Sequence, residues 1–181
     1  DLTKTRYIPS GGTIHLDEGG SVLFDAPTKT LTIKDANITC TDNNQRCINS
    51  SVEGLKVVIE GNVWLTAFDA ASVRLSGGVS NTISGNGFLA VMSSEEAFFL
   101  ADGSKLTLAV DSLYAQGDTE TIDGDLLGSG SEVTVENGFV TLNNKNKGTA
   151  IKSLGTFTVK GFSEVNIKGN GSKATVHKLK K

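Results

Sequence analysis

Residues 31–65 read LTIKDANITCTDNNQRCINSSVEGLKVVIEGNVWL, and two short patterns within this stretch decide the fold. Residues 38–40 read ITC and residues 63–65 read VWL, so triplets with apolar first and third positions begin 25 residues apart. Side chains two positions apart lie on the same face of a β-strand. The stretch therefore predicts two short strands at equivalent positions of a structural repeat.

The same spacing continues along the chain. Successive triplets of this set start 25, 25, 25, 26 and 26 residues apart, at Ile38, Val63, Phe88, Leu113, Phe139 and Val165. A second set lies a few residues earlier in each unit, starting at Leu31, Val57, Asn81, Leu106, Val133 and Phe157. A third and weaker set includes triplets at Val73, Phe98, Thr149 and Ala174. Three short strands per unit describe one coil of a solenoid.

Gly and Asn recur between the first two strands of each unit, as in residues 60–62 (EGN) and 85–87 (GNG). Both residue types tolerate the positive φ that a tight bend requires. One coil cannot bury its own apolar face, whereas stacked coils bury a continuous column. We therefore predict an all-β, single-stranded, right-handed parallel β-helix of about six to seven coils. An antiparallel sandwich is the alternative, but it does not require a sustained 25-residue register.

The repeat predicts one domain over residues 1–181. Residues 1–28 are expected to form a degenerate N-terminal coil or cap, and residues 29–181 to form the regular coils. The first and third triplet positions should point inward. The two inward columns would hold Ile38, Val63, Phe88, Leu113, Phe139 and Val165, and beside them Cys40, Leu65, Ala90, Ala115, Thr141 and Ile167.

The middle position of each triplet should then point outward. That column would hold Thr39, Trp64, Leu89, Tyr114, Val140 and Asn166. Trp64, Leu89 and Tyr114 would form a contiguous apolar strip, which is typical of a binding surface. Aromatic rings on a flat sheet suit the C–H faces of sugar rings. The alternative is that the strip is covered by a lateral partner or by residues 66–71, which include Phe68.

A Thr-rich column is expected on the first strand of each coil. Its outward residues would be Thr32, Val58, Thr82, Thr107, Thr134 and Thr158. Such a ladder can bind ice, but Thr is also a common exposed strand residue. The adjoining outward positions are mixed in chemistry, which argues against ice binding.

Two cysteines, Cys40 and Cys47, are separated by six residues. This spacing fits neither a CxxC redox motif nor a zinc half-site. We predict a disulfide that closes the intervening turn, which would add about 2–3 kcal/mol on the chain-entropy model and indicate an oxidising compartment. Two free, buried thiols are the alternative.

The best acidic cluster lies in the irregular run 118–125 (DTETIDGD). Asp118, Glu120, Asp123 and Asp125 are weak candidate ligands for Ca²⁺, although the run matches no EF-hand loop and a solvated turn is the alternative. A hydrolase needs converging carboxylates on one face, and the outward strand positions carry almost none. Arg46 and Arg74, as potential lyase bases, lie more than one coil from the run. The pattern therefore favours a protein without catalytic activity.

The composition excludes other function classes. The formal net charge is −3 and no long basic block exists, so we expect no nucleic-acid partner. No stretch approaches 18 consecutive apolar residues, so we expect no membrane insertion.

The pattern of residues 31–65, with apolar triplets, a polar corner and the phrase VIEGN, resembles secreted bacterial right-handed β-helix modules, and most closely the carbohydrate-binding-type solenoids of gut Bacteroidetes. The resemblance covers most of the chain. It implies a secreted or cell-surface module that binds a glycan or a cell-surface protein, and it carries over no catalytic residue. The Asp-pair and His-Gly motifs of the polygalacturonases are missing. A β-helix polysaccharide lyase or hydrolase, and a structural stalk or adhesin segment within a larger surface protein, are the alternatives.

Overall fold

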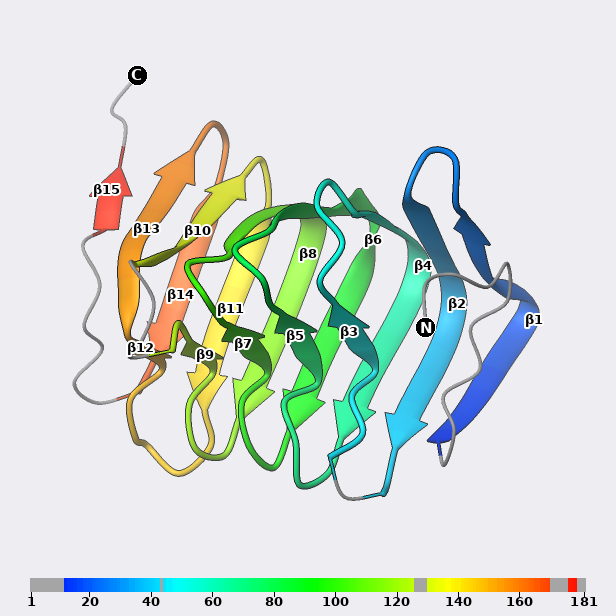
Figure 1. Ribbon diagram of the computed structural model, residues 1–181, viewed down its shortest axis with the longest axis horizontal. Coiled ribbons are helices and arrows are strands. Elements are labelled where there is room, and N and C mark those ends of the chain that lie inside the picture. Colours follow the sequence, from blue (N-terminus) through cyan, green and yellow to red (C-terminus); the bar gives the residue numbers. More distant parts are fainter. Residues whose placement is uncertain (1–11, 43, 126–129, 170–175, 179–181) are drawn as a thin grey trace.

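The computed structural model describes residues 12–42, 44–125, 130–169 and 176–178. Every regular element in this part of the chain is a β-strand, and the strands stack as a β-solenoid of about five turns (Figure 1). The predicted all-β parallel β-helix is therefore confirmed. None of the described residues belongs to a helix that is long and apolar enough to cross a membrane.

The strands form two sheets. The long strands of the larger sheet follow the order β1 (Gly12–Asp25), β2 (Thr30–Cys40), β4 (Lys56–Ala67), β6 (Ser80–Ser93), β8 (Lys105–Gly117), β10 (Ser131–Glu136), β13 (Leu154–Lys160) and β15 (Val176–Lys178). The same sheet includes β11 (Phe139–Asn144), which pairs with β8, and β14 (Glu164–Lys168), which pairs with β11. The smaller sheet follows the order β12 (Ile151–Lys152), β9 (Ile122–Asp123), β7 (Phe98–Leu100), β5 (Val73–Leu75) and β3 (Ile48–Ser50).

Each long strand from β2 to β8 contains two limbs that meet at a corner. Asp35 adopts a φ of 42° at the corner of β2, and Gly85 adopts a φ of 136° at that of β6. The Asp35 carboxylate accepts a hydrogen bond from the backbone N–H of Asn62 in the next coil, at 3.0 Å. A Cβ at Gly85 would lie 2.0 Å from the Ile59 carbonyl oxygen, so only glycine fits where these two backbones meet. The recurrent Gly and acidic or amide residues thus define the stacked corner.

The number of coils is smaller than expected because the ends differ from the repeat. β1 pairs with β2 in the antiparallel sense, from Gly12 opposite Cys40 to Asp25 opposite Thr30. It therefore covers the edge of the first coil as a cap and does not form a degenerate coil. Residues 1–11 of the expected cap lie outside the described residues. At the other end, β13 and β14 begin a further turn, for which the described residues contain no strand of the smaller sheet.

The core lies between the two sheets and includes nearly all the inward positions of the limbs. The predicted inward column is wrong at Phe88 and Phe139, and the predicted outward column is wrong at Leu89 and Val140. Leu89 is 0% exposed and pairs with Val63 and Leu113, so it lies in the core. Val140 is also buried, whereas Phe139 is exposed.

The physical reason for this error is the strict alternation of side chains along a strand. A change of register by one residue moves every side chain to the other face. In β6 the sequence 88–91 (FLAV) offers apolar residues in both registers, and the structure turns Leu89 and Val91 inward. Ala90, predicted to be inward, therefore points outward, as does Thr141 in β11.

Cys40 and Cys47 are free thiols in the structure rather than the expected disulfide, and both are buried. The Cys47 thiol lies 3.3 Å from the carbonyl oxygen of Thr66, to which it donates a hydrogen bond. Hydrogen bonding with the Cys40 thiol, followed by burial, raises the pKa of Cys47. The pair lies where the end of β2 turns toward β3, so it fills the corner between the two sheets.

Candidate functional site

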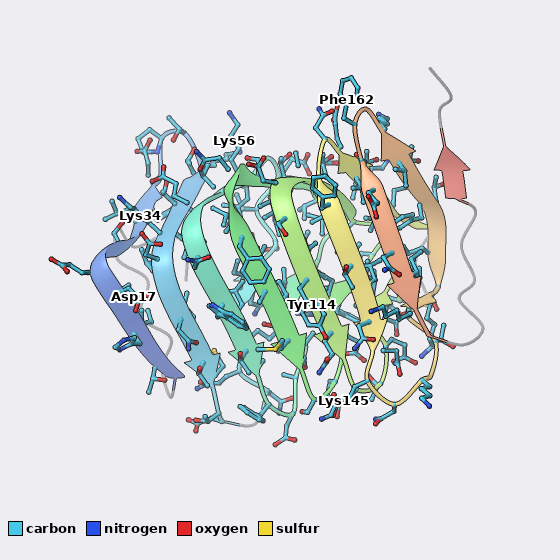
Figure 2. The ribbon with its side chains drawn as sticks, turned by 180° about the vertical axis from the view of Figure 1, so that it is seen from behind. Asp17, Lys34, Lys56, Tyr114, Lys145 and Phe162 are labelled. Atoms are coloured by element: carbon cyan, nitrogen blue, oxygen red, sulfur yellow. The ribbon has the colours of Figure 1, made fainter. Side chains whose placement is uncertain are left out.

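The outer surface of the second limb is the candidate site, and we call it the aromatic face. Its middle column follows the strand register through Asn37, Trp64, Ala90, Tyr114, Thr141 and Asn166. On one side lie Asn62, Phe88, Ser112, Phe139 and Glu164. On the other side lie Thr39, Thr66, Met92, Gln116, Asn143 and Lys168. Figure 2 shows Tyr114 on this broad face of the long strands.

An apolar surface lies in the centre of the aromatic face. Trp64 is 41% exposed, and the ring of Phe88 meets it edge-on with 5.6 Å between ring centroids. Ala90 points outward between Trp64 and Tyr114 but is 0% exposed. The larger neighbouring side chains therefore close over Ala90, and the apolar surface is continuous across three coils.

Polar groups border this apolar surface on the side of Gln116. The Tyr114 hydroxyl donates a hydrogen bond of 2.6 Å to Gln116 Oε1. Asn143 Nδ2 donates to the same oxygen at 3.0 Å and to the Tyr114 hydroxyl oxygen at 3.3 Å. These three side chains fix one another in place, so the Tyr114 ring is held by bonds at its polar end.

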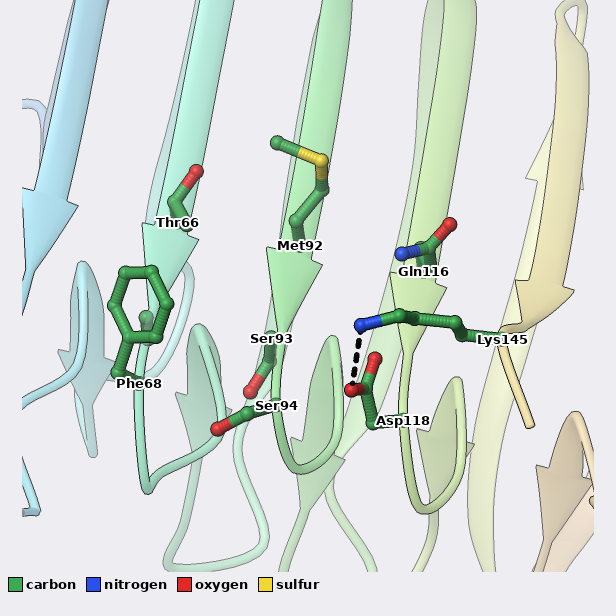
Figure 3. Close-up of a pocket in the computed structure, with 9 residues that line it drawn as sticks. Thr66, Phe68, Met92, Ser93, Ser94, Gln116, Asp118 and Lys145 are labelled. Carbon is green, nitrogen blue, oxygen red and sulfur yellow. Dashed lines mark hydrogen bonds and ion pairs between the residues drawn. The ribbon is translucent and has the colours of Figure 1, made fainter.

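A shallow pocket with a volume of about 150 Å³ lies beside the apolar surface, at the ends of the strands (Figure 3). One wall is apolar and includes Met92 and Phe68, which is 47% exposed. The opposite wall is polar and contains an ion pair of 3.0 Å between Lys145 Nζ and Asp118 Oδ2. Ligand sites in general combine apolar walls with a few polar groups that fix orientation.

The outward positions of the aromatic face carry no charged residue from β2 to β11, all of which are described. Charged side chains flank this region on both sides, with Glu164 and Lys168 in β14 and with Asp17 in β1, next to His15, which pairs with Asn37. The Lys145–Asp118 pair lies beyond the strands and neutralises itself. A ligand centred on β2 to β11 of this face would therefore meet ring surfaces, hydroxyls and amides.

Two of the three predicted binding residues are brought together here. Trp64 and Tyr114 occupy the same outward column, whereas Leu89 is in the core and is replaced on the surface by Ala90 and Phe88. Phe68 follows the end of β4 at the edge of the pocket and leaves Trp64 exposed. The sequence did not single out Gln116 and Asn143, because polar side chains on exposed strand positions carry no signal of their own.

The Thr-rich column of the first limb is shorter than expected. Thr82, Thr107, Thr134 and Thr158 are in register, but Thr82 pairs with Lys56 rather than continuing from Val58. The neighbouring column contains an ion pair of 3.1 Å between Lys105 and Glu132.

The outer surface around the smaller sheet is charged, and we call it the charged face. It gathers Arg46, Arg74, Glu96, Glu120, Asp123 and Lys152 from five successive coils. The guanidinium of Arg74 lies 5.9 Å from the centre of the Phe99 ring. Burial, followed by the charge of Arg74, lowers the pKa of Arg46.

Three carboxylates of the charged face converge. Oxygens of Glu96, Glu120 and Asp123 lie within 4.8 Å of one another. Lys152 Nζ lies 2.9 Å from Glu120 and 3.5 Å from Asp123, so an internal cation already neutralises part of the cluster. Burial, followed mainly by the negative charges of Asp123 and Glu120, raises the pKa of Glu96.

The predicted calcium candidates therefore separate into different places. Glu120 and Asp123 join the cluster, and so does Glu96 of the preceding coil, which no sequence motif indicated. Asp118 instead lines the pocket and pairs with Lys145. Asp125 lies in the turn after β9, where its backbone N–H donates a hydrogen bond to Asp123 Oδ1 at 3.2 Å. A signal for Glu96 existed in principle, since it lies about one repeat before Glu120.

No family model, no curated protein and no solved structure matches this chain.

Proposed function

We propose that this protein is a non-catalytic, secreted or cell-surface module that binds carbohydrate through the aromatic face. One observation carries the proposal: Trp64 is exposed at the centre of a sheet surface whose outward positions from β2 to β11 are uncharged and which is bordered on one side by the bonded group Tyr114 hydroxyl, Gln116 and Asn143. Sugar rings offer apolar C–H faces and hydroxyl edges, which match such a surface. Exposed apolar patches on soluble folds are typical of binding sites.

Binding of glycans tests this proposal. A glycan array followed by isothermal titration calorimetry would compare the wild type with a Trp64→Ala, Tyr114→Ala double variant. We expect the double variant to lose most of the affinity for any glycan that the wild type binds. Phe162→Ala is the matched control, since this exposed aromatic belongs to none of the three columns of the aromatic face and lies at the opposite edge of the sheet from Lys145 (Figure 2). Equal affinity of wild type and double variant would remove the aromatic face from the proposal.

A polysaccharide lyase or hydrolase is the second candidate, and the convergence of Glu96, Glu120 and Asp123 favours it. Glycoside hydrolysis uses two carboxyl groups of which one has a raised pKa and acts as the acid, and Glu96 has that property. Assays for reducing ends and for unsaturated products on a polysaccharide panel, with and without Ca²⁺, would compare the wild type with Glu96→Gln. If the wild type forms product and Glu96→Gln does not, the protein is an enzyme and not a non-catalytic binding module.

A further inference from the structure

The two ring platforms of the aromatic face lie two coils apart along the solenoid axis. Trp64 pairs with Ala90, and Ala90 pairs with Tyr114. Neighbouring strands of a sheet are about 4.8 Å apart, so the backbones of Trp64 and Tyr114 are separated by roughly 9.6 Å. Ala90 between them is 0% exposed, so Trp64 and Tyr114 are the two outward rings of the middle column, set two coils apart.

This spacing matches the geometry of one class of glycan. In an extended chain with β-1,4 equatorial linkages, each sugar advances by about the distance between two neighbouring coils. Successive rings are turned over, so that alternate sugars present the same face. Two sugars that are separated by one other would therefore reach Trp64 and Tyr114 with equivalent faces. Chains with axial linkages curve away from a flat sheet and would not reach both rings.

The surroundings of the two rings add a preference in charge and orientation. The outward positions of the aromatic face from β2 to β11 are uncharged, which disfavours uronic acids and sulfated sugars. The polar border of Gln116 and Asn143 runs along one side of the column, where it would meet the hydroxyl edge of a chain that lies parallel to the axis. Figure 3 shows Gln116 at the pocket on this side.

We infer that the aromatic face binds an extended, neutral, β-linked glycan along the solenoid axis, with alternate sugars stacked on Trp64 and Tyr114. This inference rests on the proposed carbohydrate binding and adds to it the class of glycan, the direction of the chain and a minimum length of three sugars. Trp64 supplies the larger contact, and Tyr114 supplies the dependence on chain length.

Calorimetry with cello-oligosaccharides of two to six units tests the inference. The wild type should gain about tenfold in affinity between the disaccharide and the trisaccharide, when the second ring is reached. Tyr114→Ala should abolish this gain, whereas Trp64→Ala should weaken the binding of the disaccharide and the trisaccharide alike. Tyr114→Phe is the matched control, because it keeps the ring and removes only the hydroxyl, and it should retain the gain. Circular dichroism confirms that each variant is folded.

The outcomes separate this inference from the proposed function. A gain that persists in Tyr114→Ala, or equal binding of malto-oligosaccharides with their axial linkages, would overturn the alignment on two rings and leave glycan binding in place. Binding of the protein to acidic glycans alone on the array would likewise overturn the inference of a neutral glycan and leave glycan binding in place. Absence of binding to every glycan on the array would overturn both.

Discussion

The aromatic face and the charged face belong to the same coils but differ in the side chains that occupy their outward columns. On the aromatic face, the outward columns contain rings, hydroxyls and amides, and no charge from β2 to β11. On the charged face, two arginines are followed by three carboxylates and then by Lys152. The first surface is open to a ligand, whereas the second is largely occupied with its own pairing.

The cause of this difference is the short distance between coils. Equivalent residues of neighbouring coils are about 4.8 Å apart, so charges of one sign in the same column repel strongly unless they are paired. Lys152 compensates Glu120 and Asp123 on the charged face. A column of neutral side chains needs no pairing with opposite charges, so its apolar surface stays exposed to a ligand.

The largest expected effect is the difference in stability loss between a substitution beneath the aromatic face and one on its outer surface. Leu89→Ala should lower the free energy of unfolding by about 2–5 kcal/mol, because a fully buried leucine leaves a cavity. Trp64→Ala should cost about 1 kcal/mol, because its ring is partly exposed. Denaturant unfolding measures both. Equally small losses would place Leu89 on the outer surface, as the sequence alone predicted.

The next effect concerns the neutralising cation of the charged face. Lys152→Met should lower stability at neutral pH by about 1 kcal/mol, because the ammonium group is partly exposed and its bonds to Glu120 and Asp123 are screened. The hydrogen bond to Glu120 raises the pKa of Lys152 above its ordinary 10.5. The stabilisation is therefore complete below about pH 10.5 and is lost as the pH rises through the folded-state pKa.

Thermal unfolding of wild type and Lys152→Met from pH 7 to 11 measures this contribution. Lys56→Met is the control, since Lys56 is exposed on the first limb, outside the charged face. A melting temperature of Lys152→Met equal to that of the wild type at pH 7 would contradict the role of the ion pairs.

A smaller effect of opposite sign is expected at Glu96. Its raised pKa means that the folded state binds the proton more tightly than the unfolded state, whose pKa is near 4.5. Ionised Glu96 therefore destabilises the fold, and this cost appears as the pH rises from about 4.5 through the folded-state pKa. Glu96→Gln should raise stability at pH 7 by about 0.5 kcal/mol, a melting shift of roughly 1–2 °C.

The gain of Glu96→Gln should disappear as the pH falls to about 4.5, which thermal melts at several pH values would detect. Glu18→Gln is the control because Glu18 is exposed on the N-terminal cap strand. A gain that is independent of pH would point to packing instead of charge.

The smallest expected effect is that the thiols of Cys40 and Cys47, at the corner between the two sheets, do not react in the native protein. Cys40 and Cys47 are buried, and the raised pKa of Cys47 keeps its thiol protonated. Ellman's reagent should leave the native protein unlabelled and should titrate two thiols after denaturation. Leu89→Ala should react faster, because it opens more often. Absence of labelling in denaturant without reductant would indicate the Cys40–Cys47 disulfide that the sequence predicts.

Several features of the candidate site followed from the sequence, and others did not. The repeat placed Trp64 and Tyr114 in one outward column, and both are there. It misplaced Leu89 because residues 88–91 are apolar in both registers, and local pattern cannot choose between them. It found Glu120 and Asp123 but not Glu96, because their convergence depends on how irregular turns of different coils stack.

By itself the sequence determined that this chain is a parallel β-solenoid, since a sustained repeat of apolar triplets can bury its side chains only by stacking. It also determined the recurrent corner, because only certain residues accept a positive φ. The tertiary structure decided which residues face outward in β6 and β11, that β1 closes the first coil in the antiparallel sense, and that the two cysteines remain thiols. The reason is that a shift of one residue within a coil is almost neutral locally, and contacts with the coils on either side determine its direction.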